Sequence, residues 1–413
     1  MSGYLTKIKT KIPYSDKEVN IDINGKTLIL TGGNGCGKTQ LLKLIYEKLK
    51  VSVIDRLNYN LADVERNLKS NQDQLSRIGP AHQHYKHYTQ QVEIYSRQLE
   101  DTKYPSLETS NLEEFIVNYQ ELKALLIEFE AMRKSEIVKP SSVSSISSLR
   151  DQDKQAVQQV NRKASTSSLF EQFLVTNKAN QAFSESEKIN NDPVEAARID
   201  KWFTKLETDL RNLFEDRDLE LVFKSDSFSF EIHQPHKEPY TFQTLSSGFS
   251  SIMAVYADLI TKVSLRSIDP EELTGVVLID EIDAHLHVSL QKKILSFLTQ
   301  AFPRVQFIVS THSPFVVSSI DDAVIYDLST LEQVEDLSMY SYESVLEGLF
   351  GVLPISSLLQ QNIEALAKLL DKPTIDVEEV ESLLDKLPDE DSLDSESLYF
   401  VNSAKLAINK AKR

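Results

Sequence analysis

The segment Gly32–Thr39, with the sequence GGNGCGKT, constrains the fold of this chain more than any other segment. It fits the pattern G-x-x-x-x-G-K-[ST]. The apolar run Leu28–Leu30 before it predicts a buried strand, and Gln40–Leu49 after it predicts a helix with an apolar face. Glycines let successive backbone N–H groups face one phosphate, and the start of a helix adds its positive dipole end. The segment therefore predicts a phosphate-binding loop in an α/β fold.

Roles within this loop follow from the chemistry of each side chain. We expect Lys38 to reach the β- and γ-phosphates of a nucleotide and the Thr39 hydroxyl to hold Mg²⁺. Cys36 is the only cysteine of the chain, which excludes an internal disulfide. We interpret it as a small side chain that fills space in the loop rather than as an oxidation switch. The alternative is a glycine-rich turn without a ligand. The residues expected to surround the nucleotide are Gly32, Gly33, Asn34, Gly35, Cys36, Gly37, Lys38, Thr39 and Gln40.

A second apolar run, Val276–Ile279, ends in two acids. Such a run is typical of a central parallel strand that is buried on both faces, and ligands bind at the carboxyl ends of such strands. Asp280 is the candidate ligand of Mg²⁺, together with Thr39, and Glu281 is the candidate general base for an attacking water. The alternative is that both acids cap a following helix, but capping does not explain a carboxylate pair at the end of so apolar a strand.

A third strand is predicted at Val305–Val309, and Ser310–Pro314 (STHSP) follows it. His312 can donate a hydrogen bond to a γ-phosphate at that strand end. A lone histidine is more often structural, and the neighbouring motifs favour the functional interpretation. Lys38, Glu281 and His312 are the predicted catalytic residues.

Another predicted anion site is Leu245–Phe249 (LSSGF), which opens the apolar helix Phe249–Val263. Ser246, Ser247 and Gly248 combine hydroxyl groups, a small residue and a helix start. A phosphate loop that already wraps its nucleotide leaves little room for this segment in the same subunit. We therefore predict that it completes the site of another copy, in a head-to-tail dimer or a larger oligomer. The alternative is an ordinary serine-capped helix.

These four motifs, in this order, resemble the ABC-type ATPases. Within them the chain is similar to the soluble RecF, Rad50, SMC and OLD-like branch, and it looks like the small ATPases of bacterial anti-phage systems, of the Septu or PARIS type. The resemblance covers residues 1–60 and about 215–330. It implies ATP and Mg²⁺ as ligands, ATP hydrolysis in a head-to-tail sandwich, and a separate effector protein.

One departure from that family concerns a glutamine that usually follows the helix after the phosphate loop. The strand expected in its place, Val51–Asn60, has no glutamine. Asp55, Arg56 and Asn58 are candidates for the role, which the sequence leaves unassigned.

The organisation along the chain is predicted as four segments. Thr39 and Ser246 are separated by 206 residues, and much of that interval has helical periodicity. A helical hairpin or short coiled coil is expected, with apolar positions running from Leu61 to Phe129, and a β-hairpin at Leu219–Phe223 and Phe228–Ile232. The predicted fold is an ABC-type P-loop ATPase head of the α/β class. Its segments are an N-terminal lobe (1–60), a helical insertion (61–214), a C-terminal lobe (215–330) and a C-terminal helical region (331–413).

Composition bears on the partners. The formal net charge of −17 does not indicate a nucleic-acid partner. Contact with DNA through a local patch at the basic end 401–413 is the alternative. No run of 18 apolar residues and no signal peptide occurs, so a cytoplasmic protein without membrane contact is expected.

The C-terminal region has neither histidine nor cysteine, which argues against a fused histidine-based nuclease. Its acids are predicted to be solvated rather than a metal site, so a separate nuclease or toxin partner is implied. We expect an ATPase that senses infection or gates this effector. The alternatives are a RecF-like ATPase that acts directly on DNA and an ATP-dependent scaffold with little turnover.

Overall fold

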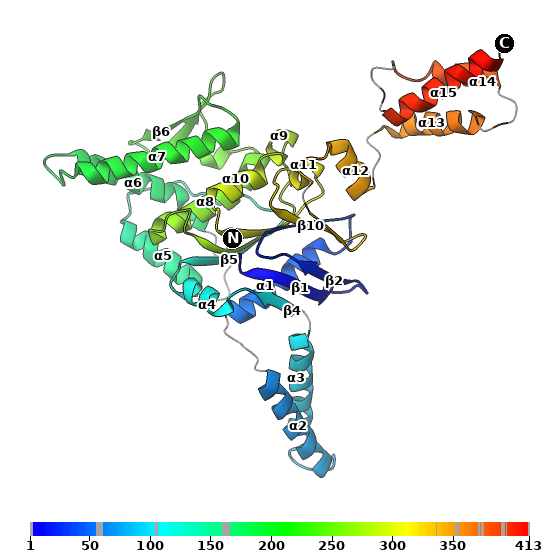
Figure 1. Ribbon diagram of the computed structural model, residues 1–413. Helices are drawn as coiled ribbons and strands as arrows, with labels where there is room; N and C mark the ends of the chain where they lie inside the picture. The colour runs from blue at the N-terminus through cyan, green and yellow to red at the C-terminus, as the bar shows by residue number, and fades with distance from the viewer. Residues whose placement is uncertain are drawn as a thin grey trace. The chain divides into compact units, whose positions relative to one another are not determined.

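A six-stranded sheet carries three of the four motifs (Figure 1). Its order is β11-β10-β3-β9-β8-β5, and all neighbouring strands are parallel except β10 and β11. Because β3, β9 and β8 are adjacent, the three motifs that follow them meet at one edge of the sheet. The strands are β3 (Thr27–Thr31), β5 (Ala124–Phe129), β8 (Thr274–Ile279), β9 (Val305–Ser310), β10 (Ala323–Asp327) and β11 (Glu332–Glu335).

The structure is a computed structural model of the chain. It describes residues 3–54, 61–103, 106–158, 166–335, 337–351, 355–370, 376–389 and 395–411, with residues 372 and 393. The α/β class expected from the sequence is confirmed, as are the strands of the phosphate loop, of the acid pair and of the histidine motif.

A smaller antiparallel sheet covers the first helix. It has the order β2-β1-β4, formed by β2 (Glu18–Asp22), β1 (Leu5–Lys11) and β4 (Ser106–Thr109). Helix α1 (Lys38–Val53) contributes a buried apolar stripe, as the 3.6-residue period predicts. One apolar core joins this stripe to side chains of both sheets, including Leu41, Ile45, Leu28, Leu278 and Ile8.

The side-chain amide of Gln306 ties the two sheets together. Gln306 lies in the buried strand β9, where its Nε2 donates to the Leu5 carbonyl (2.8 Å) and to the Lys26 carbonyl (2.9 Å). Its Oε1 accepts from the Leu5 N–H at 2.8 Å. The amide thus bonds to Leu5 as a neighbouring strand would, which satisfies a buried polar group and fixes the position of β1.

The segment Leu245–Phe249, called the signature segment below, opens helix α8 (Ser247–Arg266), which is buried along most of its length. Tyr256 of α8 packs against Phe297 and Phe302, the latter directly after α10. Figure 1 shows α8 and α10 on the side of the large sheet opposite to α1. The other α-helices between residues 146 and 317 are α5 (Ile146–Gln158), α6 (Phe170–Glu185), α7 (Pro193–Phe214), α9 (Val288–Gln291), α10 (Ile294–Ala301) and α11 (Pro314–Val317).

The β-hairpin predicted before the signature segment is confirmed as β6 (Glu220–Lys224) and β7 (Ser229–His233). Two short 3₁₀ turns, Thr166–Leu169 and Phe242–Thr244, complete this region.

The inserted segment is only partly helical, which corrects the prediction for 61–214. Helices α2 (Leu61–Arg77) and α3 (Tyr85–Lys103) form the expected hairpin. After them, however, come β4, a short helix α4 (Leu112–Gln120), and β5, which pairs in parallel with β8. The run ALLIEF at Ala124–Phe129 has no decisive period of its own. Its pairing with β8 therefore decides that it is a strand.

A second correction concerns Val51–Asn60, which was predicted to be a strand. Val51–Val53 form the last turn of α1, and Asp55, Arg56 and Asn58 lie outside the described residues. The strand beside β8 is β5, on the far side of the helical hairpin.

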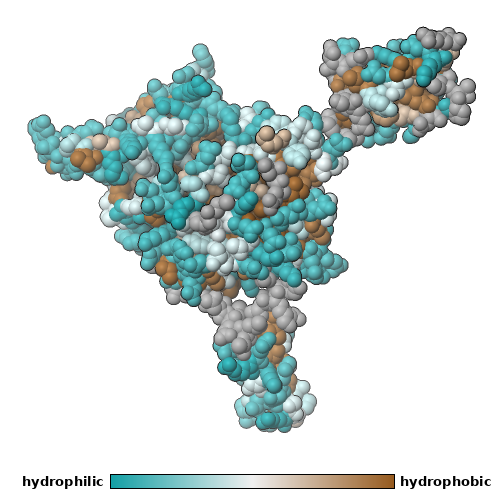
Figure 2. Space-filling model, in the orientation of Figure 1, coloured by the Kyte–Doolittle hydropathy of each residue, from teal (hydrophilic) through white to brown (hydrophobic). Residues whose placement is uncertain are grey.

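The chain divides into two units, Met1–Tyr342 and Glu343–Arg413. The second unit contains α12 (Tyr342–Phe350) except for its first residue, and all of α13 (Ser357–Leu370), α14 (Val377–Leu384) and α15 (Ser395–Ala411). Its own small core includes Leu366, Val380 and Ala404. Large apolar side chains such as Leu358 and Tyr399 are exposed, and Figure 2 shows hydrophobic surface on this unit among hydrophilic residues. The predicted C-terminal helical region began too early, since β11 pairs with β10.

Candidate functional site

The phosphate loop lies between β3 and α1, and two of its glycines have no substitute. Gly37 has φ 108°, and a Cβ there would lie 2.7 Å from Ile12 Cγ2. Gly32 has φ 122°, and a Cβ there would meet the Asp327 carboxylate and the Cys36 sulfur at 2.9 Å. Side chains are excluded at both positions, so backbone N–H groups are free to line the loop.

Lys38 begins helix α1, and its side chain lies along this loop. Its Nζ donates to the carbonyls of Gly32 (2.8 Å) and Gly33 (3.2 Å) and contacts Cys36 Sγ at 3.7 Å. The ammonium is therefore held inside the loop at the end of β3, where a bound phosphate chain would meet it. The small Cys36 side chain fills space beside it.

Thr39 and Asp280 meet across the sheet edge. Thr39 Oγ1 donates to Asp280 Oδ2 at 2.8 Å, and Ser310 Oγ donates to Asp280 Oδ1 at 2.5 Å. A hydroxyl and a carboxylate are hard oxygen ligands of the kind that Mg²⁺ prefers, with phosphate and water oxygens completing its shell. The two predicted metal residues therefore fit this ion. Ser310 is a second residue that holds Asp280, and the sequence analysis assigned Ser310 no role of its own.

Glu281 follows Asp280 in a left-handed turn. Its φ is 44°, a conformation that costs a non-glycine residue about 1 kcal/mol or more. The Glu281 N–H donates to Ser310 Oγ at 2.7 Å, and the Ile282 N–H donates to the Ser310 carbonyl at 3.0 Å. This turn leaves Glu281 exposed at the end of β8, so its carboxylate can reach a water molecule.

Asp283 does not cap a following helix. Its Oδ1 accepts from Thr311 Oγ1 at 2.6 Å, and the N-cap of the next helix, α9, is His287. The carboxylate thus joins the loop after β8 to the loop after β9.

The charges of Lys38 and of three nearby carboxylates act on His312. Burial lowers the pKa of His312, and the positive charge of Lys38 lowers it further, while Asp283, Glu281 and Asp280 partly offset both effects. The imidazole is half-buried and neutral at pH 7. A neutral ring has one N–H donor and one acceptor, as contact with a phosphate oxygen or its water requires.

The signature residues lie apart from these groups. Ser246 and Ser247 are exposed, and no hydrogen bond in the described part of the chain joins residues 246–248 to residues 32–40. Gly248 is buried, and a Cβ on it would lie 2.8 Å from the carbonyl oxygen of His285. The chain's own packing therefore requires a glycine at this position, independently of any ligand.

Arg133 is a site residue that sequence reasoning missed. It follows β5, and its guanidinium donates to the carbonyls of Asp280 (2.8 Å), Ile282 (3.1 Å) and Glu281 (3.3 Å). A basic residue shortly after a buried strand was the available signal, but β5 had been interpreted as helix.

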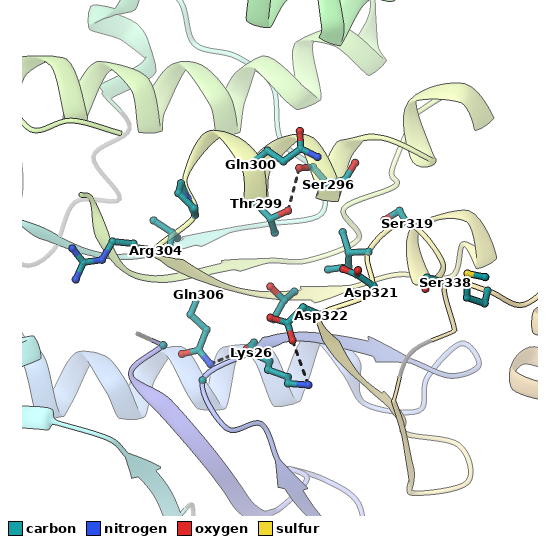
Figure 3. Close-up of a pocket in the computed structure, with 17 residues that line it drawn as sticks. Lys26, Ser296, Thr299, Gln300, Arg304, Gln306, Ser319, Asp321, Asp322 and Ser338 are labelled. Atoms are coloured by element: carbon teal, nitrogen blue, oxygen red, sulfur yellow. Dashed lines mark hydrogen bonds and ion pairs between the residues drawn. The ribbon is translucent and has the colours of Figure 1, made fainter. Parts of the chain in front are cut away.

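A separate cavity of about 520 Å³ lies at the opposite edge of the large sheet. Figure 3 shows Lys26, Arg304 and Asp322 among its lining residues. These residues precede β3, β9 and β10, whereas the motif residues follow their strands. The cavity is therefore not the phosphate site, and its polar side chains are partly paired, as in the 3.3 Å ion pair between Lys26 and Asp322.

Within the described ranges, no group of three or more His, Cys, Asp or Glu side chains is arranged to hold a metal ion. Asp389 is described, whereas Glu390, Asp391 and Asp394 of the acidic C-terminal segment are not. No described helix has both the length and the apolarity that crossing a membrane would require.

Comparison with protein families identifies the type of domain. The family model described as "AAA domain, putative AbiEii toxin, Type IV TA system" matches residues 93–318. This range contains β5, the signature segment, the acid pair and His312, but not the phosphate loop.

Curated relatives include retron and Septu proteins. The Retron Ec83 probable ATPase of Escherichia coli is 46% identical over 85 residues, 20% of this chain and 16% of that protein. The Septu protein PtuA of Bacillus thuringiensis is 33% identical over 151 residues, 35% of this chain and 37% of that protein. The Retron Vc95 probable ATPase of Vibrio cholerae is 24% identical over 307 residues, 73% and 52% respectively. The chain thus spans about half or less of the length of the curated relatives it matches. The resemblance to Septu-type ATPases is confirmed.

Among solved structures, an SMC head bound to the C-winged helix domain of ScpA has a TM-score of 0.38 at 14% identity, over 78% of this chain and 93% of that chain. A nucleotide-free ATP-binding cassette of an ABC transporter has a TM-score of 0.34 at 11% identity, over 84% and 96%. Similarity at this level supports no argument about function.

Proposed function

The chain belongs to this AbiEii-type AAA-domain family of ATPases, and from that premise we propose that it binds and hydrolyses ATP with Mg²⁺ at the edge of its large sheet. The observation that carries the proposal is the 2.8 Å hydrogen bond between Thr39 and Asp280. It joins the phosphate loop to the acid pair over a long stretch of sequence, and the other proposed site residues lie on the neighbouring strand ends.

Binding rests on the loop Gly32–Thr39. Its backbone N–H groups and the start of α1 favour the β-phosphate, and the Lys38 ammonium supplies positive charge to the β- and γ-phosphates. Thr39 and Asp280 would hold Mg²⁺, which when bound neutralises phosphate charge and orients the phosphate chain. Gln40 and Asn34 complete the surroundings of the nucleotide.

Hydrolysis requires a base close to the γ-phosphate. Glu281 accepts a proton from a water molecule as that water's oxygen bonds to the γ-phosphorus. The bond between the γ-phosphorus and the β–γ bridging oxygen breaks, so that ADP and phosphate form. His312, neutral at pH 7, donates its N–H to a γ-phosphate oxygen and thereby orients the transferred group.

We propose that the signature segment of one copy closes the site of another. Ser246 and Ser247 are exposed at the start of a 20-residue helix, where N–H groups and hydroxyls favour an anion. They have no hydrogen bond to the phosphate loop of the same chain within the described residues. A head-to-tail dimer, or a larger oligomer built from it, satisfies both facts.

The biological role we propose is control of a separate nuclease or toxin in anti-phage defence. The support is the similarity to a Septu protein and to retron ATPases. The net charge of −17 favours a protein effector over direct DNA binding.

Phosphate release by the purified chain, with Mg²⁺ and with a chelator, tests the central proposal. We expect turnover that requires Mg²⁺ and is lost in Asp280→Asn. ATP binding without turnover would support the scaffold alternative instead. Strong stimulation by added DNA would support the alternative of an ATPase that acts directly on DNA.

A further inference from the structure

The segment Glu130–Ser135, which we call the linking loop, contacts both the acid-pair turn and the signature helix. Hydrogen bonds connect it to both. None of the four motifs includes this loop.

On one side, Arg133 binds the turn that carries Glu281. The guanidinium donates to the carbonyls of Asp280, Glu281 and Ile282, at 2.8, 3.3 and 3.1 Å, and to the Glu130 carbonyl of its own loop at 3.1 Å. Three successive carbonyls on one side of a turn repel one another unless a donor lies among them. A planar guanidinium with five N–H donors can bridge them, whereas an ammonium has three donors around a single point.

This contact bears on a strained residue. Glu281 has φ 44°, so its conformation persists only while its surroundings hold it. Ser310 holds the N–H side of the turn, at Glu281 and Ile282. Arg133 holds the carbonyl side. The direction of the Glu281 side chain is therefore fixed from two strands, β9 through Ser310 and β5 through Arg133.

The positive charge of Arg133 favours its contacts with the carbonyl oxygens of residues 280–282. Burial lowers its pKa to about 10, and the carboxylates of Asp283, Asp280 and Glu281 oppose that effect. The group stays protonated at neutral pH. Among the described residues its buried Nε has no hydrogen-bond partner, so the guanidinium is not placed for the best satisfaction of its own donors.

On the other side, the linking loop is bonded to helix α8. The Ser135 N–H donates to Ser250 Oγ at 3.1 Å, and the two hydroxyls are 3.2 Å apart. Ser250 is in the first turn of α8, and its N–H donates to the carbonyl of Ser246 at 2.8 Å. Only one residue separates Arg133 from Ser135, so displacement of the start of α8 is transmitted to Arg133.

We propose that Arg133 is a positioning residue for Glu281, and that the linking loop makes this positioning depend on the state of the signature helix. The inference rests on the proposed function, since it assumes that Glu281 is the base. Contact of Ser246 and Ser247 with the nucleotide of a neighbouring copy would displace the start of α8, and with it the linking loop. The rate of hydrolysis at the chain's own site would thereby depend on that contact.

Arg133→Ala tests the positioning role, and Lys134→Ala, at an exposed neighbour in the same loop, is the control. We expect kcat to fall about 10- to 100-fold with KM for ATP nearly unchanged, because a misplaced base costs rate and not binding. Arg133→Lys should recover only part of the rate. Added guanidinium at a non-denaturing concentration should raise the rate of Arg133→Ala but not of wild type. Unchanged kcat, or loss of ATP binding in proportion to kcat, would overturn the positioning role.

Ser250→Ala tests the link to α8. We expect a several-fold lower kcat, and the double variant Arg133→Ala/Ser250→Ala should be no slower than Arg133→Ala alone, since both act through one loop. Additive losses would overturn the link.

Glu281→Gln separates this inference from the proposed function. If that variant hydrolyses ATP normally, the base assignment fails. If it is inactive while Arg133→Ala is normal, only the present inference fails.

Discussion

Ser310 Oγ donates to Asp280 Oδ1 at 2.5 Å and also accepts from the N–H of Glu281 at 2.7 Å, so one hydroxyl orients both acids at the end of β8. Asp280 uses its other oxygen for Thr39. The proposed metal residue and the proposed base are therefore held as one unit from the neighbouring strand. Substitutions around this unit should separate metal binding, nucleotide binding and hydrolysis.

Lys38→Ala should abolish turnover and weaken ATP binding severely. It removes the ammonium that lies inside the loop, against the carbonyls of Gly32 and Gly33. Binding of a fluorescent ATP analogue and phosphate release are the measurements. Lys43→Ala, at an exposed lysine of the same helix, is the control. Normal binding and turnover in Lys38→Ala would refute the assignment of the site.

Thr39→Ala should weaken Mg²⁺-dependent activity more than metal-free nucleotide binding. The hydroxyl is bonded to Asp280 and would be a ligand of the ion, whereas the loop backbone stays intact. Titration of activity with Mg²⁺ should show a higher requirement in the variant, and Thr39→Ser should behave almost as wild type. An equal loss of metal-free ATP binding would contradict a metal role.

Glu281→Gln should bind ATP and stall before hydrolysis, since the amide keeps the shape but accepts no proton. The ATP-bound, associated form should then accumulate. Light scattering with and without ATP measures this, with Glu271→Gln, at an exposed acid, as the control. If ATP causes no more association in Glu281→Gln than in wild type, the sandwich is in doubt.

Mixing two inactive variants tests whether sites are shared between copies. Lys38→Ala fails in the phosphate loop, and Ser247→Arg places a bulky cation at the exposed start of α8. Ser247 is preferable to Gly248, because any side chain at 248 would collide with the chain's own His285 carbonyl at 2.8 Å. Mixed dimers should contain one doubly altered site and one intact site, and should recover part of the activity.

Ser76→Arg, at an exposed serine of the α2–α3 hairpin, is the matched control for the added arginine. Full activity of Ser247→Arg alone would remove the signature segment from the site. Absence of recovery on mixing has a narrower meaning, since it also follows if both sites must be intact for either to work.

The pH dependence of stability should carry a contribution from His312. Its pKa in the folded chain lies below 6.5, owing to burial and to the charge of Lys38. Below pH 6.5 and down to the folded pKa, the unfolded chain binds more protons at this residue, so stability falls as the pH falls through that window. Above pH 6.5 the residue is neutral in both states and contributes no pH dependence. Wild type should therefore lose more stability on acidification than His312→Gln.

Urea unfolding at pH 7.5 and at mildly acidic pH measures that difference. His84→Gln, at an exposed histidine of the hairpin turn, is the control for the substitution itself. A wild type and a His312→Gln variant with the same pH dependence would contradict the environment described for His312.

The sequence was sufficient for elements whose pattern is set locally. The phosphate loop, the strands before Asp280 and His312, and the start of α8 each combine an apolar run with specific turn residues. The strand β5 was missed because its identity comes from pairing with β8, not from its own period. Arg133 was missed with it, since backbone carbonyls of residues 280–282 leave no mark in the sequence. The same holds for Gln306, whose partners lie about 300 positions away.

The strand order has a consequence for synthesis of the chain. The neighbours of β3 in the sheet are β9 and β10, both made more than 270 residues after it. At about 5–20 residues per second, the phosphate-loop strand leaves the ribosome tens of seconds before either neighbour exists. Until then β3, all of whose residues are buried in the finished sheet, has no partner strand. The proposed ATP site is therefore assembled late in translation, and a chain that stops before β9 has the loop sequence but cannot build the site.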